Sequence, residues 1–156
     1  MEYTFEIRKL SSLFYTNYPQ SEFPEIERKH TRGYATLLID THDGYLICIP
    51  FRSHISHESA YMFKNSVRSR TNDSGLDYTK ICIIDNLDYI DDVPGIVDTD
   101  EYIEVRDNLD LIVEEACNYI EEYVSHKKGI ALLSNRQFRK KYWFTTLKYF
   151  HKELNI

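Results

Sequence analysis

Residues 34–50, YATLLIDTHDGYLICIP, decide the fold of this chain because they hold two apolar segments joined by a tight turn. The segments are Tyr34–Asp40 and Tyr45–Pro50, and the connection Thr41–Gly44 ends in Asp-Gly. An Asp-Gly pair between apolar runs is the strongest short-range signal for a β-hairpin. The sequence therefore predicts two antiparallel strands here, joined as a hairpin.

The rest of the first half carries further strand signals. Three segments have the composition or the alternation of strands: Glu2–Leu10, Tyr61–Val67 and Asp77–Asp85. The turn-rich segment Thr71–Gly75 separates the last two. Ser11 or Ser12 is placed to cap a short helix that reaches Asn17, because Pro19 cannot continue it.

The C-terminal third is predicted to form two long helices. In the first, Thr99 is the expected N-cap and Gly129 the expected C-cap, and one face is apolar: Val105, Leu109, Ile112, Ala116 and Tyr123. The second is expected to begin near Ser134 and to carry three stripes: apolar Trp143, Leu147, Phe150 and Leu154, basic Lys141, Lys148 and Lys152, and aromatic Phe138, Tyr142 and Tyr149. The predicted fold class is α+β, in a single domain spanning residues 1–156.

Composition limits the class of protein. The 156 residues are 42% hydrophobic and 28% charged, which is typical of one folded domain with a sizeable core. No apolar run has the length of a membrane span, and the first residues lack the basic and apolar parts of a signal peptide. Cys48, Cys82 and Cys117 lie far apart in apolar stretches, so we expect reduced core thiols in a cytoplasmic protein.

The net charge of −6 is unevenly distributed. Residues Asp85–Glu122 contain 14 acidic residues and one basic residue, Arg106. The remainder of the chain then has 18 basic and 11 acidic residues, a net charge of +7. This segregation allows an acidic protein to present a positive surface to RNA.

The segment Pro50–His57 concentrates groups suited to RNA cleavage. It places a cation, a hydroxyl and two imidazoles after a hairpin strand, where Pro50 is expected to stop the ladder and bring them to the rim of the sheet. Cleavage by transesterification needs a base for the ribose 2′-OH, an acid for the leaving 5′ oxygen, and donors for the phosphorane charge. It needs no metal, because the nucleophile belongs to the substrate.

Simpler interpretations of the same residues remain open. Ser53 is placed to cap a short helix, with Glu58 as an acidic residue near its start. His54 and His57 have the spacing of half a metal site, but no third ligand stands at a suitable distance. Arg52 is then an ordinary surface cation. Only the clustering of these residues favours a catalytic role.

Four motifs, in this order along the chain, resemble a known toxin family: Phe14-Tyr15-x-x-Tyr18, Arg32-Gly33-Tyr34, Tyr45-Leu46-x-x-x-Pro50-Phe51-Arg52-Ser53-His54, and Ser74-Gly75-Leu76-Asp77-Tyr78-x-Lys80. With the helix-rich C-terminal third, they make most of the chain similar to the ToxN/AbiQ-like toxins of type III toxin–antitoxin systems, and within them to the CptN-like branch.

The resemblance implies a compact, strongly bent antiparallel sheet flanked by helices, distantly similar to the MazF/Kid toxins. It implies a metal-independent endoribonuclease without a cofactor, which cuts cellular or phage mRNA, often at adenine-rich sites, and leaves a cyclic phosphate. Toxins of this family act in phage defence by abortive infection. Each is neutralised by a repeated pseudoknot RNA that the toxin trims from a precursor, and toxin and RNA alternate in a closed ring.

The resemblance also assigns residues. Ser53 matches the active-site serine, Tyr15 an aromatic residue near the cleft, and Arg32 a basic residue before the first hairpin strand. The better-known branch has Thr-Ser-Pro-Lys where this chain has Arg52-Ser53-His54-Ile55. Its active-site lysine is therefore missing, and Arg52 or His54 must replace it.

The sequence thus predicts five catalytic residues: Ser53, Arg52, His54, Arg32 and Tyr15. Ser53 bonds the phosphate or the 2′-OH, His54 moves a proton with His57 as its substitute, and both arginines stabilise the phosphorane. The predicted RNA-binding residues are Arg28, Lys29, His57, Lys64, Lys80, Lys141, Lys148 and Lys152. Alternatives are a non-catalytic RNA-binding module and a protein-interaction domain that uses the acidic helix face. Core packing is an equal alternative for Tyr15 and Tyr18.

Overall fold

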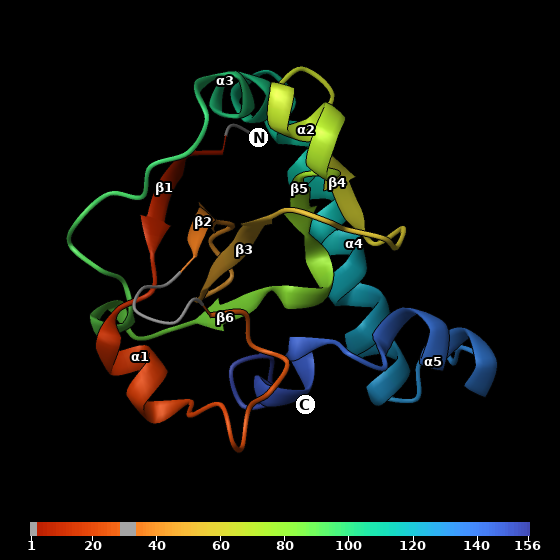
Figure 1. Ribbon diagram of the computed structural model, residues 1–156. Coiled ribbons are helices and arrows are strands. Elements are labelled where there is room, and N and C mark those ends of the chain that lie inside the picture. The colour runs from red at the N-terminus through yellow and green to blue at the C-terminus, as the bar shows by residue number, and fades with distance from the viewer. Residues whose placement is uncertain (1–2, 29–33) are drawn as a thin grey trace.

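The computed structural model describes residues 3–28 and 34–156, which form an antiparallel sheet with helices around it (Figure 1). The six strands are β1 (Phe5–Lys9), β2 (Ala35–Asp40), β3 (Leu46–Arg52), β4 (Ala60–Met62), β5 (Gly75–Asp77) and β6 (Cys82–Ile84). Along the sheet their order is β1-β2-β3-β5-β4, and β6 also pairs with β3. The predicted α+β class with an antiparallel sheet is confirmed.

Among the described residues, two helices lie between strands along the chain, and three more follow the last strand. They are α1 (Ser12–Asn17), α2 (Val67–Asn72), α3 (Thr99–Asp107), α4 (Leu109–Lys127) and α5 (Asn135–Tyr142), with short 3-10 turns η1 (Tyr78–Lys80), η2 (Leu87–Tyr89) and η3 (Thr146–Tyr149). The N-cap of α1 is Ser11, whose hydroxyl accepts a hydrogen bond from the N–H of Phe14. This short helix is therefore where the sequence predicted it.

The central hairpin is confirmed. β2 and β3 pair antiparallel with Ile39 opposite Ile47. Gly44 in the connecting turn has φ +92°, a conformation that costs glycine little. The carboxylate of Asp40 also accepts a hydrogen bond from the backbone N–H of His42, which stabilises the turn.

Strand β3 changes its partner along its length. Its first part pairs with β6 and its last two residues pair with β5, where Arg52 lies opposite Gly75. Pro50 was expected to end the ladder, but it lies inside β3 opposite Thr36 of β2. Proline is tolerated there because residue 50 falls between the parts of β3 that pair with β6 and with β5, so no partner needs its missing N–H.

Two of the predicted strands are shorter than expected. The segment Asp77–Asp85 is divided by η1 into the end of β5 and the strand β6. The predicted strand Tyr61–Val67 ends at Met62, because Ser66 caps α2 and accepts a hydrogen bond from the N–H of Ser69. The first residue of β5, Gly75, has to be a glycine, because a Cβ at this position would lie 2.3 Å from the carbonyl oxygen of Tyr61.

The first predicted long helix is two helices. Its N-cap is Asp98 rather than Thr99, since the Asp98 carboxylate accepts from the backbone N–H groups of residues 100 and 101. The chain breaks the helix at Asn108, and the 19-residue α4 follows. Gly129, with φ +73°, lies just after α4, as predicted for a C-terminal glycine.

The prediction of a second long helix is wrong. Ser134 begins α5 with a capping box, as expected, but α5 has eight residues and ends at Tyr142. The hydroxyl of Thr145 then caps η3. Trp143, expected in the core, is 55% exposed. The predicted stripe of three lysines is therefore distributed over α5, η3 and the chain end: Lys141, Lys148 and Lys152.

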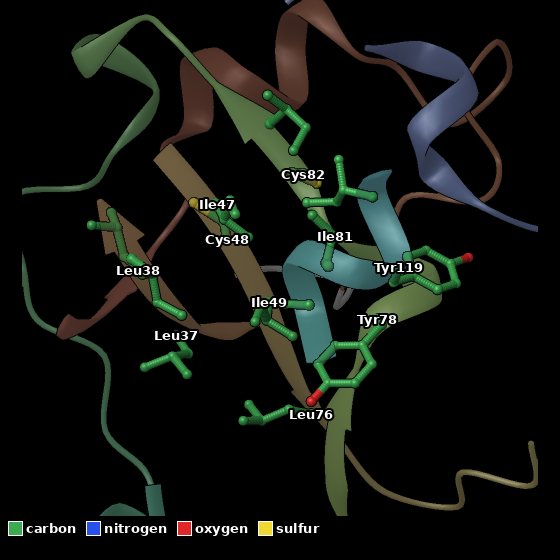
Figure 2. Close-up of a cluster of buried hydrophobic side chains, with 14 of the residues drawn as sticks. Leu37, Leu38, Ile47, Cys48, Ile49, Leu76, Tyr78, Ile81, Cys82 and Tyr119 are labelled. Atoms are coloured by element: carbon green, nitrogen blue, oxygen red, sulfur yellow. The ribbon is translucent and has the colours of Figure 1, made fainter. Parts of the chain in front are cut away.

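The core lies between the sheet and the helices that cover it. Figure 2 shows its centre, where residues of β2, β3 and β6 meet side chains from η1 and α4: Leu37, Ile47, Ile49, Tyr78, Cys82 and Tyr119. Cys48 and Cys82 are buried free thiols, as predicted, and Cys117 is a half-buried free thiol. Within residues 3–28 and 34–156, no helix combines the length and the apolar character that a bilayer crossing needs.

Candidate functional site

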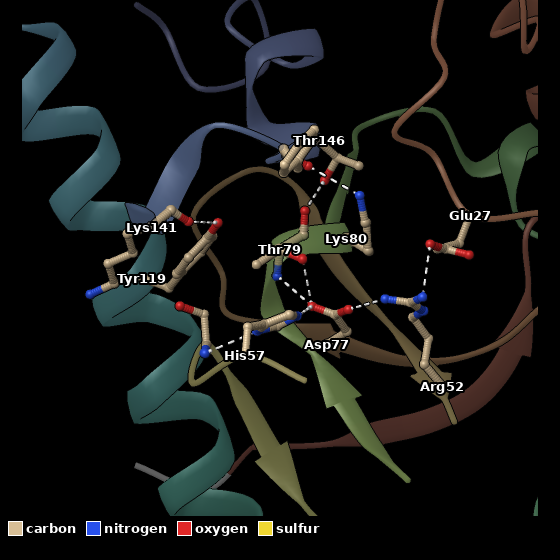
Figure 3. A network of polar contacts seen from close by, with 11 residues as sticks. Glu27, Arg52, His57, Asp77, Thr79, Lys80, Tyr119, Lys141 and Thr146 are labelled. Atoms are coloured by element: carbon tan, nitrogen blue, oxygen red, sulfur yellow. Dashed lines mark hydrogen bonds and ion pairs between the residues drawn. The ribbon is translucent and has the colours of Figure 1, made fainter. Parts of the chain in front are cut away.

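The C-terminal end of β3 positions Arg52 over β5. Because Arg52 is paired with Gly75, Asp77 is its diagonal neighbour on the same face of the sheet. The Nη1 atom of Arg52 lies 2.5 Å from Oδ2 of Asp77, and its Nη2 atom lies 3.3 Å from Oε1 of Glu27 (Figure 3). Two carboxylates thus neutralise the guanidinium that was predicted to bind phosphate.

Asp77 is the centre of this network. Its side chain is fully buried, and it accepts hydrogen bonds from the backbone N–H and the hydroxyl of Thr79. The Nε2 atom of His57 lies 3.1 Å from Oδ1 of Asp77, the oxygen that Thr79 also contacts, while Arg52 contacts Oδ2 (Figure 3). Burial alone would raise the pKa of Asp77, but the hydrogen bonds from His57, Thr79 and Arg52 hold it below its ordinary value.

His57 has both ring nitrogens occupied. Nδ1 accepts a hydrogen bond from the backbone N–H of Ser59 at 3.1 Å, and Nε2 faces Asp77. This arrangement corresponds to the neutral tautomer with its proton on Nε2. His57 is therefore held in place by its neighbours, and neither nitrogen is free to take a proton from a substrate.

Lys80 joins this network to the C-terminal part of the chain. Its ammonium donates to the carbonyl oxygen of Phe144 at 3.1 Å. Nearby, the hydroxyl of Thr146 donates to the carbonyl oxygen of Ile81. Burial lowers the pKa of Lys80, while the charges of Glu27 and Asp77 act in the opposite direction. Lys80 is thus engaged in holding η1 against the 143–146 segment.

Ser53 belongs to a different cluster from Arg52. Its hydroxyl oxygen accepts a hydrogen bond from Nε of Arg68 at 3.0 Å, and Nη1 of Arg68 lies 2.9 Å from Oε1 of Glu101. Arg52 is the last residue of β3 and Ser53 is the first residue of the bend that follows, and their side chains contact different partners. The predicted catalytic group is therefore divided into an Asp77 cluster and a Ser53 cluster.

Glu101 anchors the Ser53 cluster from the core. It is fully buried and accepts hydrogen bonds from the hydroxyls of Ser66 and Ser74 in addition to its pair with Arg68. Glu104, one turn later, is also buried and accepts from the hydroxyl of Tyr61. Part of the acidic stretch is therefore structural, and the acidic surface is smaller than the sequence indicated.

His54 follows Ser53 in an unusual conformation. Its φ of +59° lies in the left-handed region, which histidine adopts at a cost. Its backbone N–H donates to the carbonyl oxygen of Asn72, and the next N–H donates to Asp73, so the end of α2 holds this turn. The imidazole is exposed and has no hydrogen-bond partner within the described residues.

Tyr15 and Tyr18 are packed at the edge of the core. The guanidinium of Arg28 lies 5.4 Å from the ring of Tyr15 and donates to the carbonyl oxygen of Tyr18 at 2.7 Å. Phe14 contacts both tyrosine rings. Burial raises the pKa of Tyr15, and it raises the pKa of Tyr18 to about 12. These contacts favour the packing role for both tyrosines and make Arg28 part of that packing.

The predicted RNA-binding lysines fall into two groups. Lys141 pairs with Glu122 at 2.7 Å and Lys148 pairs with Glu25 at 3.0 Å, so carboxylates partly neutralise the charges of both lysines. The exposed ones without an ion pair to a described residue are Lys64 and Lys152. Lys29 and Arg32 lie outside the described residues. Within the described ranges, no three His, Cys, Asp or Glu side chains are placed to hold a metal ion.

Sequence reasoning missed three important residues: Asp77, which was quoted but given no role, Arg68 and Glu101. Nothing in the local pattern identifies Arg68, because its partners lie 15 and 33 residues away.

Comparison with known proteins finds no matching family model, no matching curated protein and no matching solved structure.

Proposed function

We propose that this protein is a metal-independent endoribonuclease, the toxin of a type III toxin–antitoxin system. The observation that carries the proposal is the hydrogen bond from Arg68 to Ser53 beside an exposed histidine, His54. These three groups supply a hydroxyl, a fixed cation and a proton carrier at one rim of the sheet. RNA transesterification needs these functions and no further reagent.

Ser53 and Arg68 are placed to bind the scissile phosphate. Because the Ser53 oxygen already accepts from Arg68, its own proton is free to donate to a phosphate oxygen. The Arg68 side chain is one third exposed, and its link to the buried Glu101 fixes its direction. A pre-oriented pair of donors of this kind stabilises the charge that develops on a phosphorane.

The surroundings of Ser53 are suited to a polyanion. The segment 64–70 contains Lys64, Arg68 and Arg70 and no acidic residue. The side chains of Lys64 and Arg70 are exposed, and neither forms an ion pair with a described residue. Free cations beside the fixed Arg68 would attract the RNA backbone and increase the rate of encounter.

His54 performs a proton transfer in this proposal. One proton leaves the ribose 2′-OH, the 2′ oxygen attacks phosphorus, and the bond from phosphorus to the 5′ oxygen breaks. The 5′ oxygen receives a proton, and a 2′,3′-cyclic phosphate remains. The exposed imidazole of His54 takes the first proton, and water at this open rim supplies the second.

Arg52 and His57 are positioning residues in this scheme. Both bind Asp77, so they fix the two ends of the segment 52–57 against β5. Their nitrogens are occupied by carboxylates and by the Ser59 N–H, which leaves Ser53 and His54 between them as the reactive groups. This assigns Arg52 a different role from the phosphate contact that the sequence suggested.

The partners follow from the same proposal. The antitoxin is a repeated pseudoknot RNA that the toxin trims and with which it forms a closed ring, and the substrates are cellular or phage mRNAs. Exposed lysines such as Lys64 and Lys152 are available for its phosphates. Expression of the toxin without this RNA would arrest growth.

The test compares two serines of one loop. Purified Ser53→Ala protein should lose RNA cleavage by roughly 100- to 1000-fold, the usual cost of one transition-state donor. Ser56→Ala should cleave like the parent, because Ser56 is exposed and bonds to no described residue. The products are analysed for 2′,3′-cyclic phosphate ends. If the parent protein binds RNA and leaves it intact, the proposed ribonuclease activity is refuted.

The second candidate is a non-catalytic RNA-binding module. It is favoured by the complete pairing of the Asp77 cluster, in which Arg52 and His57 have little capacity left for a substrate. In that case Ser53→Ala would change neither RNA affinity nor growth, and no cyclic-phosphate product would form under any condition.

A further inference from the structure

The segment Tyr123–Lys152 is the most cationic part of the chain. It contains eight of the 19 basic residues and no Asp or Glu. It comprises the end of α4 and the helix α5, and it continues through η3 to Lys152. A concentration of positive charge without carboxylates indicates an anionic ligand, because ordinary solvated surfaces mix both signs.

A pocket of about 410 Å³ is lined by residues of this segment and by Glu25. Its aromatic lining comes from both helices and the turn after α5: Tyr123, Phe138, Tyr142 and Trp143. The ammonium of Lys127 lies over two of these rings, 4.9 Å from the centre of Phe138 and 5.7 Å from that of Tyr123. The pocket therefore offers flat apolar surfaces next to a cation.

Trp143 is the most exposed ring of the lining. Its side chain follows α5, is 55% exposed, and has the guanidinium of Arg139 5.3 Å from the ring centre. Phe144 beside it is 65% exposed. Large aromatic side chains at the surface lose the free energy of burial unless a partner covers them. The exposed part of the Trp143 ring offers a surface on which a flat ligand can stack beside the guanidinium of Arg139.

The charges in the pocket favour an anion. Among the described residues that line it, the one carboxylate is that of Glu25, which is engaged by Lys148 and by the hydroxyl of Tyr149. Lys127 has no carboxylate partner within the described residues. After these pairs are formed, the lining retains a net positive charge, provided by Lys127.

We propose that this pocket is a binding site for single-stranded RNA, in which a base stacks on Trp143 and Lys127 and Arg139 hold the adjacent phosphates. Base stacking on aromatic rings beside basic side chains is the usual mode of single-strand binding. The ligand class rests on the proposed function, but the site is separate from the Ser53 cluster. The two sites lie toward opposite ends of α4, whose 19 residues span about 28 Å (Figure 1).

The chain offers a direct probe of stacking, because Trp143 is its one tryptophan. A short single-stranded oligoadenylate added to Ser53→Ala protein, which keeps the oligonucleotide intact, should quench the intrinsic fluorescence. The affinity should fall with salt, by roughly 0.7 in log K per log salt for each phosphate contact. Trp143→Ala, measured by anisotropy of a labelled oligonucleotide, should bind about 5- to 100-fold more weakly.

Two neighbouring lysines form the matched control. Lys127→Gln removes the charge over the rings and should weaken binding and lower the salt slope by about one contact. Lys128→Gln removes an equal charge from an exposed residue outside the pocket lining and should change the affinity little. Equal effects of the two variants would overturn the site, because only general electrostatic attraction would then be present.

The remaining outcomes separate this inference from the others. Absence of quenching by the oligonucleotide overturns the stacking site. A response to anionic phospholipid vesicles without a response to the oligonucleotide also overturns it and identifies a membrane surface instead. Quenching that depends on Lys127, in a parent protein that never cleaves RNA, supports the site while refuting the enzyme.

Discussion

The Nε atom of Arg68 donates a hydrogen bond to the hydroxyl of Ser53 over 3.0 Å, and the same guanidinium pairs with the buried Glu101. The serine predicted from the hairpin motif is thus tied through one arginine to a carboxylate on α3. This relay fixes the side chain of Arg68 toward the rim of the sheet. It also makes Arg68 the most informative residue to change.

Replacing Arg68 should abolish cleavage. Arg68→Lys keeps a charge but loses the planar fork that bonds Ser53 and Glu101 together, so the cleavage rate should fall by roughly 100-fold or more. The measurement is the single-turnover rate of RNA cleavage. Arg70→Lys is the matched control, because Arg70 is exposed on the same helix and bonds to no described side chain. Similar rates for the two variants would remove Arg68 from the site.

A folding control accompanies this variant. Loss of the arginine leaves the buried carboxylate of Glu101 with two serine partners, which should cost roughly 1–3 kcal/mol of stability. The double variant Arg68→Lys, Glu101→Gln removes the unpaired charge. If it regains the unfolding temperature of the parent without regaining cleavage, the arginine acts on the substrate and not only on the fold.

The buried Asp77 predicts a pH dependence of stability. Its pKa is lower in the folded protein, so its network stabilises the fold above the pKa of about 3.9 that an unfolded aspartate has. This contribution falls away as the pH decreases from there through the folded pKa. In urea denaturation between about pH 5 and 3, Asp77→Asn should lose less stability with acid than the parent does. Asp73→Asn, at an exposed position, should keep the parent's slope.

Sequence patterns predicted what depends on neighbouring residues. The hairpin at Gly44, the Ser11 cap and the Ser134 capping box are all local features, and all three are confirmed. The second long helix failed because Thr145 offers a new cap that competes with continued helix, so Trp143 is turned to the surface. Helical spacing of apolar residues assumes one continuous helix, so it did not predict that the helix ends at Tyr142.

The site could be predicted only in part, for a different reason. The sequence identified Ser53 and Arg52 as neighbours after a strand expected to stop at Pro50, whereas β3 continues to Arg52 and the two side chains contact different partners. Their actual partners, Arg68 and Asp77, lie 15 and 25 residues away and meet them only after the strands have paired. Such contacts leave no periodic signal, so one predicted cluster is two.

The two histidines should respond differently to substitution. If His54 moves the proton, the cleavage rate should depend on pH, and His54→Gln should flatten this profile. His57→Gln should lower the unfolding temperature, since it removes the contacts to Asp77 and Ser59. If His57→Gln flattens the pH profile of cleavage and His54→Gln does not, then His57 rather than His54 transfers the proton.

Chelation should leave cleavage unchanged. In the proposed reaction Ser53 and Arg68 hold the phosphorane charge and His54 moves the proton, so no step requires a divalent ion. RNA cleavage is measured after treatment with EDTA, and the ends are analysed for cyclic phosphate. Activity that disappears with chelator and returns with added Mg²⁺ or Mn²⁺ would contradict this mechanism.

The left-handed conformation of His54 predicts a conflict between stability and activity. A histidine at φ +59° is strained by roughly 1–2 kcal/mol relative to a glycine, which adopts this region freely. His54→Gly should therefore raise the free energy of unfolding by about 1 kcal/mol, although part of the gain is offset by the greater freedom of glycine in the unfolded chain. The same variant should lose the pH-dependent cleavage. His42→Gly, at the left-handed position of the β2–β3 turn, is the control, because it relieves comparable strain far from Ser53 and should keep full cleavage. If His54→Gly destabilises the protein or cleaves RNA like the parent, the strain at this position has no connection to catalysis, and His54 is only a turn residue.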